Sequence, residues 1–386
     1  MPGESQKFNG EDAEGMSERV LPHRDWVLLP MLSLLTIVAL LLLFRWIAVK
    51  EFPESTPAGY RSVYECVNGV GTNQLSGLGG IARADCWGNM SDTPLTEYRL
   101  NGRGHRAGAE YSPKAAGAYR IVMIGSSFAI GEGVPVEETI APRLADDLQR
   151  ETGRKVEVYN EGMFGEVPDV IAAHFNDVMP AEPDLVLWLL TPHDIKDTTP
   201  GSAKTPPRRV GLAELARNRF SFDGQDQLVV LLRHLLFSGQ GQYVKSYLAG
   251  AQDAGFLRAG LDAEWLSHLQ AFDSDDARIE TQARADKVPV ATVLLPNRAQ
   301  AAMISMGEWP QGFDPYKLEE ELDSIVASHG GNHIDILHDL RAVPNAERNF
   351  FTVNGHPKAE GDAILARLLA KELSGNILSS STTDRQ

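Results

Sequence analysis

The sequence of 386 residues is poor in cysteine and in positive charge. Its two cysteines, Cys66 and Cys86, cannot form a zinc site, and their spacing excludes a C-x-x-C redox motif. They could close one disulfide in an oxidising compartment, or they could be two free buried thiols. Lysine and arginine total 36 against 52 aspartates and glutamates, a net charge of −16. This balance argues against nucleic acid or an anionic membrane surface as the main partner.

Motifs for metals and nucleotides are also missing. The sequence shows no cluster of metal-ligating residues, no phosphate-binding loop with its lysine and no G-x-G-x-x-G fingerprint, so we expect no cofactor. No internal repeat is visible. The composition is otherwise that of a globular protein, with 43% hydrophobic and 23% charged residues, and the length suits one large domain or two ordinary ones.

One long run without charge lies near the N-terminus. Residues 26–44 contain no charged side chain, and at about 1.5 Å per residue a helix of this length crosses a hydrocarbon core of about 30 Å. Trp26 and Trp46 bracket the run as interface anchors. We predict an uncleaved transmembrane signal anchor at 26–49. A cleaved signal peptide is the alternative, but the run is longer than the usual signal core and no A-x-A site follows it.

The composition changes on both sides of this run. Residues 1–25 are polar and acidic and predict a disordered tail. Residues 50–118 indicate a linker and then a glycine-rich lead-in with weak periodicity. Residues 119–375 predict the folded domain, and residues 376–386 a disordered tail.

Short apolar runs alternate with helical patterns within the folded domain. The predicted strands are 119–125, 155–160, 183–191, 288–296 and 332–340. This alternation predicts an α/β fold, a three-layer α/β/α sandwich with a mostly parallel five-stranded sheet. A mostly helical insertion, 198–286, separates the third and fourth strands.

Reactive groups of an open parallel sheet gather at the carboxyl ends of its strands. The first strand ends in Gly125-Ser126-Ser127, where a serine would lie on a sharp turn into a helix with its hydroxyl exposed. Taken alone, these residues are better explained by ordinary turn and N-cap chemistry.

Three later positions add to this serine. Gly162 follows the second strand and could bring a backbone N–H close to a reacting carbonyl. His193 follows the third strand and could complete an oxyanion hole as a side-chain donor. His356 precedes the last helix and could be the general base. Each residue alone is compatible with an ordinary loop glycine or a structural histidine.

Together, the order and placement of these residues resemble the SGNH (GDSL-type) hydrolase superfamily, whose fold is flavodoxin-like. Gly125-Ser126-Ser127 and the continuation "FAIGEGVPVEET" resemble its first block, with Ser127 at the nucleophile position. Gly162 matches the second block and "TPHD" the third. His356 with "PKAEGDAILARLL" matches the last block, and "YRLNGRGHRAGAEYSP" resembles the lead-in of membrane-anchored members. The resemblance covers roughly residues 98–375.

The chain departs from the family pattern at three places. Ser126 replaces the aspartate beside the nucleophile, and His193 replaces the asparagine that donates to the oxyanion. The acid that precedes the histidine by two or three residues is missing. A backbone carbonyl could orient His356 instead, and the side-chain candidates for the acid or orienting group are Asn354, Asp335, Asp339 and Glu360.

The resemblance implies a membrane-anchored serine esterase or acyl-ester hydrolase. Ser127 would attack an ester carbonyl, and His356 would take its proton. The N–H groups of Ser127 and Gly162, with His193, would form the oxyanion hole. Anchored relatives act on acetylated cell-envelope polysaccharides, sometimes as O-acetyltransferases, so the resemblance implies an extracytoplasmic glycan ester as substrate. The alternative is a catalytically impaired binding or scaffold protein of envelope polysaccharide assembly, which the altered blocks favour.

The charges that flank the apolar run do not decide its orientation. The cysteine pair and the resemblance both favour a single-pass membrane protein with the bulk of the chain outside the cytoplasm, in the periplasm or on the outer face. A bridge between Cys66 and Cys86 would then staple the glycine-rich loop between them. The sequence does not indicate the acyl group, the alcohol or the oligomeric state.

Overall fold

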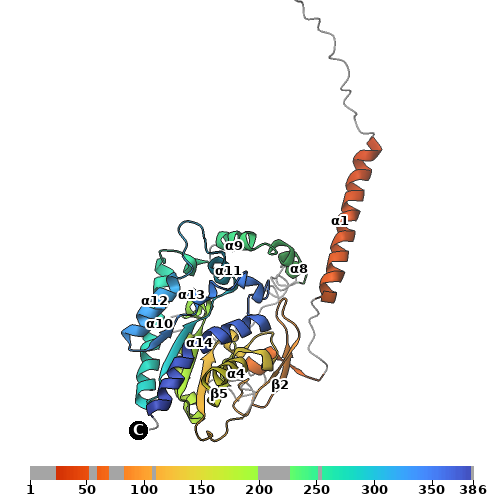
Figure 1. The fold of residues 1–386 in the computed structure, drawn as a ribbon. Helices are drawn as coiled ribbons and strands as arrows, with labels where there is room; N and C mark the ends of the chain where they lie inside the picture. The colour runs from red at the N-terminus through yellow and green to blue at the C-terminus, as the bar shows by residue number, and fades with distance from the viewer. Residues whose placement is uncertain are drawn as a thin grey trace, which may run out of the picture. The chain divides into compact units, whose positions relative to one another are not determined.

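The computed structural model describes residues 23–51, 59–68, 82–106, 110–198, 227–250 and 254–383 (Figure 1). The chain divides into two compact units, Met1–Ile47 and Ala48–Gln386. The predicted N-terminal tail and the linker fall largely outside the described residues, as does part of the predicted insertion.

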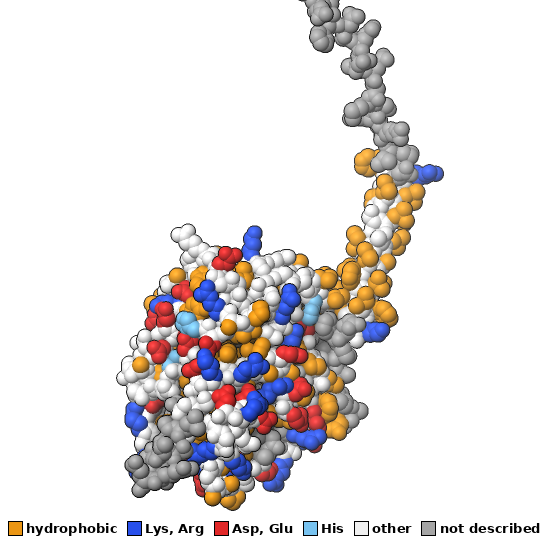
Figure 2. Space-filling view, in the orientation of Figure 1, with side chains coloured by type: hydrophobic (Ala, Val, Ile, Leu, Met, Phe, Trp, Pro, Cys, Tyr) orange, Lys and Arg blue, Asp and Glu red, His pale blue; other side chains and the backbone are white. Residues whose placement is uncertain are grey.

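The helix α1 (His23–Glu51) carries the predicted membrane span. Its stretch Trp26–Ala48 is long and apolar enough to cross a membrane. The large hydrophobic side chains of this stretch are exposed, and Figure 2 shows them along the visible face of the helix. A helix that is apolar on every side fits a lipid environment, since a helix on a protein core needs only one apolar stripe.

A five-stranded parallel sheet forms the centre of the second unit. Its order is β5-β4-β6-β7-β8, and each neighbouring pair is parallel. This order is flavodoxin-like and confirms the predicted sheet. Every residue of β4, β6 and β7 is buried, which is why these strands read as continuous apolar runs. The strands are β4 (Tyr119–Gly125), β5 (Val156–Asn160), β6 (Leu185–Leu190), β7 (Val290–Leu294) and β8 (Asn332–Ile334).

Two groups of helices cover the sheet. In the first, α4 (Ile140–Thr152) packs against α14 (Ala359–Thr383); in the second, α10 (Ala263–Asp286) packs against α5 (Pro168–His174) and α12 (Lys317–Ser328). Right-handed crossovers place the two groups on opposite faces, which gives the predicted three layers.

The remaining helices are short and lie mostly in connections. The α-helices are α3 (Ser127–Ile130), α6 (Pro192–Asp197), α8 (Gln227–Leu236), α9 (Gln240–Ala249), α11 (Arg298–Met306) and α13 (Leu337–Leu340). The 3₁₀ helices are η1 (Val136–Glu138), η2 (Phe175–Ala181), η3 (Gly255–Leu257) and η4 (Ala346–Asn349).

The lead-in segment, residues 59–118, contains a small sheet that was not predicted. The strand β2 (Asp85–Gly88) pairs in parallel with β1 (Arg61–Ser62) and antiparallel with β3 (Thr96–Arg99), beside the helix α2 (Val63–Asn68). Strands of two to four residues are too short to show a period-2 pattern. The disulfide between Cys66 and Cys86 joins α2 to β2 and lies in a small second core, to which Ile130 and Met163 of the sheet domain also contribute.

The boundaries differ from the prediction at two places. The fifth strand ends at Ile334, because Asp335 accepts hydrogen bonds from the N–H groups of Leu337 and His338 and starts α13 instead. The closing helix continues past Gly375 to Thr383, where a disordered tail was expected. In the predicted insertion, residues 199–226 and 251–253 lie outside the described part, and the rest is mostly helical.

Candidate active site

Two neighbouring strands bring Ser127 and His193 to the carboxyl edge of the sheet. Ser127 follows β4 and His193 follows β6, at the point where the strand order reverses and where such sheets bind ligands. Gly125 ends β4 with a φ of +142°, and a Cβ there would lie 2.4 Å from the carbonyl oxygen of Leu189. Only glycine fits this close approach, so the turn that presents Ser127 depends on it.

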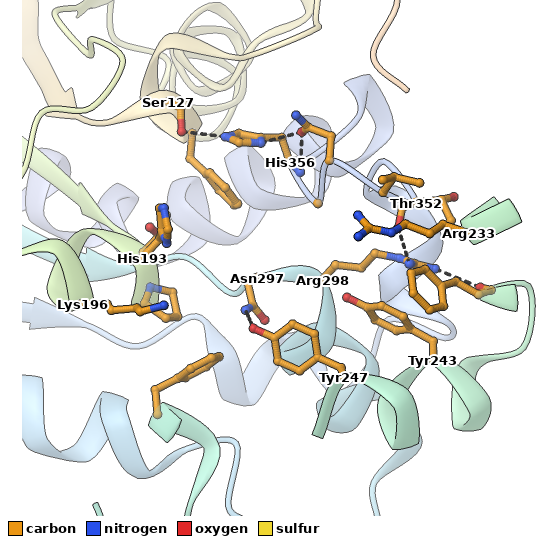
Figure 3. A pocket seen from close by; sticks show the side chains of 18 of the residues that line it. Ser127, His193, Lys196, Arg233, Tyr243, Tyr247, Asn297, Arg298, Thr352 and His356 are labelled. Atoms are coloured by element: carbon orange, nitrogen blue, oxygen red, sulfur yellow. Dashed lines mark hydrogen bonds between the residues drawn. The ribbon is translucent and has the colours of Figure 1, made fainter. Parts of the chain in front are cut away.

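His356 reaches Ser127 from the loop before α14. Its Nε2 lies 2.6 Å from Ser127 Oγ (Figure 3). The ring packs on Phe128, with 4.7 Å between the ring centroids, and the carbonyl oxygen of His356 accepts from the N–H of Phe351. Burial lowers the pKa of His356 below its ordinary value of 6.5, although the nearby Glu132 carboxylate opposes this shift. The imidazole is therefore neutral at pH 7 and can accept a hydroxyl proton.

Asn354 is the one orienting candidate that the structure brings to His356. Its Oδ1 lies 2.6 Å from His356 Nδ1 and also accepts from the backbone N–H of His356. The carboxylates of Asp335 and Asp339 are instead paired with the side chains of His338 and Lys371, and Glu360 is exposed on the first turn of α14.

Glu132, which was not predicted as a site residue, lies next to Asn354. Its Oε1 accepts from Asn354 Nδ2 at 2.6 Å, and its Oε2 lies 3.5 Å from His356 Nε2. The side chain is only 3% exposed. Gly131 and Gly133 flank it with φ of +78° and +75°, so a tight turn after α3 points Glu132 back toward the histidine. The sequence feature that could have pointed to Glu132 is a carboxylate between two glycines, a few residues after the candidate nucleophile.

Residues of the lead-in segment hold this turn in place. The hydroxyl of Tyr98 accepts from the N–H of Gly133 at 2.8 Å. The guanidinium of Arg106 is buried and stacks over the Tyr98 ring at 4.3 Å. It donates to the carbonyl oxygens of Glu97, Ile130, Gly131 and Val134.

The lead-in segment also holds the loop that carries His356. The Asp92 carboxylate accepts from the backbone N–H groups of Val353 at 3.1 Å and Asn354 at 2.9 Å, and it pairs with His234 at 2.9 Å. Burial works against ionisation of Asp92, but His234 and these N–H groups outweigh it and lower its pKa. The backbone on both sides of the Ser127–His356 contact is therefore fixed from outside the sheet.

The predicted oxyanion donors are less well placed. The N–H of Gly162 donates to Asn160 Oδ1 at 2.9 Å, and Gly162 packs against Ala129 and does not line the pocket. This geometry speaks against the predicted role of Gly162, because its N–H already has an acceptor. His193 lines the pocket but is exposed, with its Nε2 3.5 Å from Asp197.

Ser126, the residue before the candidate nucleophile, is buried. It hydrogen-bonds the carboxyl of Asp194, which also caps α6 through Thr191. Burial raises the pKa of Asp194 to about 6. We interpret Ser126 and Asp194 as a structural pair that joins the turns after β4 and β6.

A cavity of about 460 Å³ opens beside Ser127 and His356. Of its 20 described lining residues, six are phenylalanine, tyrosine or tryptophan, three are lysine or arginine, and none is a carboxylate. Figure 3 labels Lys196, Arg233, Arg298, Tyr243 and Tyr247 in this wall, and Phe237, Phe256 and Trp265 also line it. Within the described ranges, no group of three or more histidine, cysteine, aspartate or glutamate side chains could hold a metal ion.

Comparisons with known proteins give structural matches alone. No protein-family model matches the sequence, and no curated protein matches it. A lipase/acylhydrolase from Enterococcus faecalis is 16% identical, with 67% of this chain and 96% of that one covered and a TM-score of 0.37. An acetylxylan esterase from Geobacillus stearothermophilus, solved as a catalytic mutant, is 12% identical, with 66% and 94% covered and a TM-score of 0.39. Nothing about the reaction of this chain follows from a likeness at this level.

Proposed function

We propose that this protein is a membrane-anchored serine esterase of the SGNH type. The observation that carries the proposal is the 2.6 Å contact between Ser127 Oγ and the neutral His356 Nε2, at the wall of a cavity of about 460 Å³. A nucleophile and a base within hydrogen-bond distance, with the base held by a third group, are the pattern of covalent acyl transfer. Asn354 is that third group.

The reaction divides into two steps. Ser127 Oγ bonds to the ester carbonyl carbon while its proton passes to His356 Nε2, and the alcohol then leaves with that proton. Water, activated by the same nitrogen, cleaves the acyl-serine and releases the acid. An alcohol in place of water would make the protein an acyltransferase. The N–H of Ser127 and the side chain of His193 are the proposed oxyanion donors, and Gly162 could join them only if its N–H left Asn160.

The proposed substrate is an ester on an extracytoplasmic glycan. The candidate membrane span of α1 supports an anchored enzyme, and the Cys66–Cys86 disulfide supports an oxidising compartment. Aromatic walls suit the apolar faces of a sugar ring or a short acyl group. The resemblance of the sequence blocks to anchored polysaccharide esterases supports the same substrate class.

The test uses the full chain in detergent with p-nitrophenyl acetate. We expect turnover that falls to the background rate in Ser127→Ala, and labelling of Ser127 by a fluorophosphonate. Ser324→Ala, at an exposed position of α12, is the matched control and should keep full activity. If the wild type shows no serine-dependent turnover and no labelling, the protein is instead a binding or scaffold protein, the function that the occupied Gly162 N–H favours.

A further inference from the structure

We propose that Glu132 replaces the missing acid of the triad and positions His356 through Asn354. This inference rests on the proposed function, because it assigns a residue to the same reaction. Glu132 lies outside the pocket lining, so it is a positioning residue and touches no substrate. The geometry assigns it two effects, one on the tautomer of His356 and one on its charge.

The first effect follows from which end of the Asn354 amide faces the histidine. An asparagine side chain has an oxygen that accepts hydrogen bonds and an NH₂ that donates them. The Glu132 carboxylate lies 2.6 Å from one end of the amide and accepts, so that end is the NH₂. The oxygen then faces His356 Nδ1 at 2.6 Å and also accepts the backbone N–H of His356.

This arrangement selects the useful tautomer. Because Asn354 Oδ1 can only accept, the proton of neutral His356 lies on Nδ1, and the lone pair of Nε2 faces the Ser127 hydroxyl. In serine proteases, replacing the triad aspartate by asparagine costs about 10⁴ in kcat because the wrong tautomer results. Here the carboxylate of Glu132 prevents the amide flip that would produce that tautomer.

The second effect is electrostatic. When His356 takes the serine proton it becomes a buried cation, which costs free energy unless a negative charge is near. Glu132 Oε2 lies 3.5 Å from His356 Nε2 and supplies that charge. His193 acts on the pKa of His356 in the opposite direction to Glu132, and the Asp92–His234 pair lies behind the backbone of Asn354.

Hydrogen bonds from neighbouring segments hold Glu132 in its position. The turn that carries it bonds to Arg106 through three backbone carbonyls and to Tyr98 through the N–H of Gly133. Asp92 holds the backbone of Asn354 on the opposite side. Both partners of the 2.6 Å Glu132–Asn354 contact are therefore fixed independently.

The decisive experiment combines two substitutions in the full chain. Glu132→Gln keeps the size of the side chain but loses the negative charge, and its own amide can offer Asn354 a donor as well as an acceptor, so kcat/KM should fall roughly 10²–10⁴-fold. KM should change little, because Glu132 does not line the pocket. Adding Asn354→Asp places a carboxylate directly against Nδ1, and the double variant should recover to within about tenfold of the wild type.

Each single change has a matched comparison. Asn354→Asp alone puts two carboxylates side by side, which disfavours ionisation of one of them, so it should be less active than the double variant. Glu138→Gln, an exposed glutamate in η1 on the same connection, should leave kcat/KM unchanged. Thermal unfolding of every variant identifies any that fail to fold. A folded Glu132→Gln with kcat/KM within about threefold of the wild type, or a double variant no better than Glu132→Gln, overturns the proposal.

A second measurement does not depend on turnover. In a Ser127→Ala background, a ¹⁵N-histidine NMR titration reports the pKa of His356. Removing the negative charge with Glu132→Gln should lower that pKa, and an unchanged or higher value overturns the electrostatic part of the proposal. If the wild type hydrolyses no ester while this shift is observed, the proposed function fails and the coupling of Glu132 to His356 remains.

Discussion

The parallel sheet and the lead-in segment contribute to the candidate site in different ways. The sheet presents Ser127 and His193 at its strand ends and the loop before α14 adds His356, whereas no described lead-in residue lines the pocket. The lead-in residues Asp92 and Arg106 instead bind the loop that carries His356 and the turn that carries Glu132. Loops beyond strand ends leave the hydrogen-bond ladder of the sheet, so their backbone groups need other partners.

The comparison indicates that the region around the sheet supplies the side chains that could react, whereas the lead-in segment holds their loops in position. Ser127 and His356 are 229 residues apart in the sequence and meet at 2.6 Å. A displacement of about 1 Å at a catalytic group can cost about 10²-fold in rate. If the lead-in segment holds these loops in position, substitutions in it should lower kcat/KM although none of the substituted residues contacts the substrate.

The largest expected effect is that of Arg106→Met. The variant leaves several buried carbonyl oxygens without their donor, so we expect a loss of about 3 kcal/mol in the free energy of unfolding. The turn that carries Glu132 should also shift, with a fall of about 10²-fold in kcat/KM. Chemical denaturation and p-nitrophenyl acetate kinetics measure the two effects.

The control for this prediction is Arg99→Met, which removes an exposed arginine from β3 in the same segment. It should leave both the free energy of unfolding and kcat/KM close to the wild-type values, because exposed ion pairs contribute little to stability. If Arg106→Met loses stability but keeps the wild-type kcat/KM in its folded fraction, the lead-in segment stabilises the fold and does not position the site.

The next effect concerns the disulfide. Replacing both Cys66 and Cys86 by serine removes a cross-link with a sequence separation of 20, which should lower the free energy of unfolding by about 3 kcal/mol. The bridge reaches the turn that carries Glu132 only indirectly, through the small core that includes Tyr98 and Ile130, so kcat/KM should fall less than in Arg106→Met. Non-reducing mass spectrometry of the native protein is the companion measurement. Two free thiols there would contradict both the bridge and the extracytoplasmic assignment.

The smallest effect is expected for Asp92→Asn. Asparagine has one acceptor oxygen, so one of the two backbone N–H groups, of Val353 or Asn354, loses its partner at a cost of about 1–2 kcal/mol. We expect kcat/KM to fall about tenfold.

The wild-type Asp92 also predicts a pH dependence of stability. Its pKa in the folded state lies below the ordinary value of 3.8, so its stabilisation is present above that value and is lost as the pH falls through the folded pKa. Asp92→Asn should remove this contribution, whereas Asp85→Asn at an exposed position should keep it. Equal acid unfolding of wild type and Asp92→Asn would contradict the assignment.

The sheet was predictable because its strands are buried on both faces. Residues 119–125 and 183–191 read as apolar runs, and β4 and β6 lie within them almost without change. The lead-in sheet was not predictable, since its strands are very short and are stabilised by a disulfide and a small shared core. The order of the sequence blocks likewise predicted Ser127 and His356, whereas the position of the Gly162 N–H depended on an Asn160 side chain two residues away.

The sequence by itself determined the elements, because apolar runs, glycines and helix signals act over a few neighbouring residues. It determined a charge-free helix long enough for a membrane, a parallel α/β domain and the turn that presents Ser127. Only the tertiary structure decided which group stands beside His356. Asn354 and Glu132 are 222 residues apart, and their hydrogen bond exists only because two loops from distant parts of the chain are held together at one edge of the sheet.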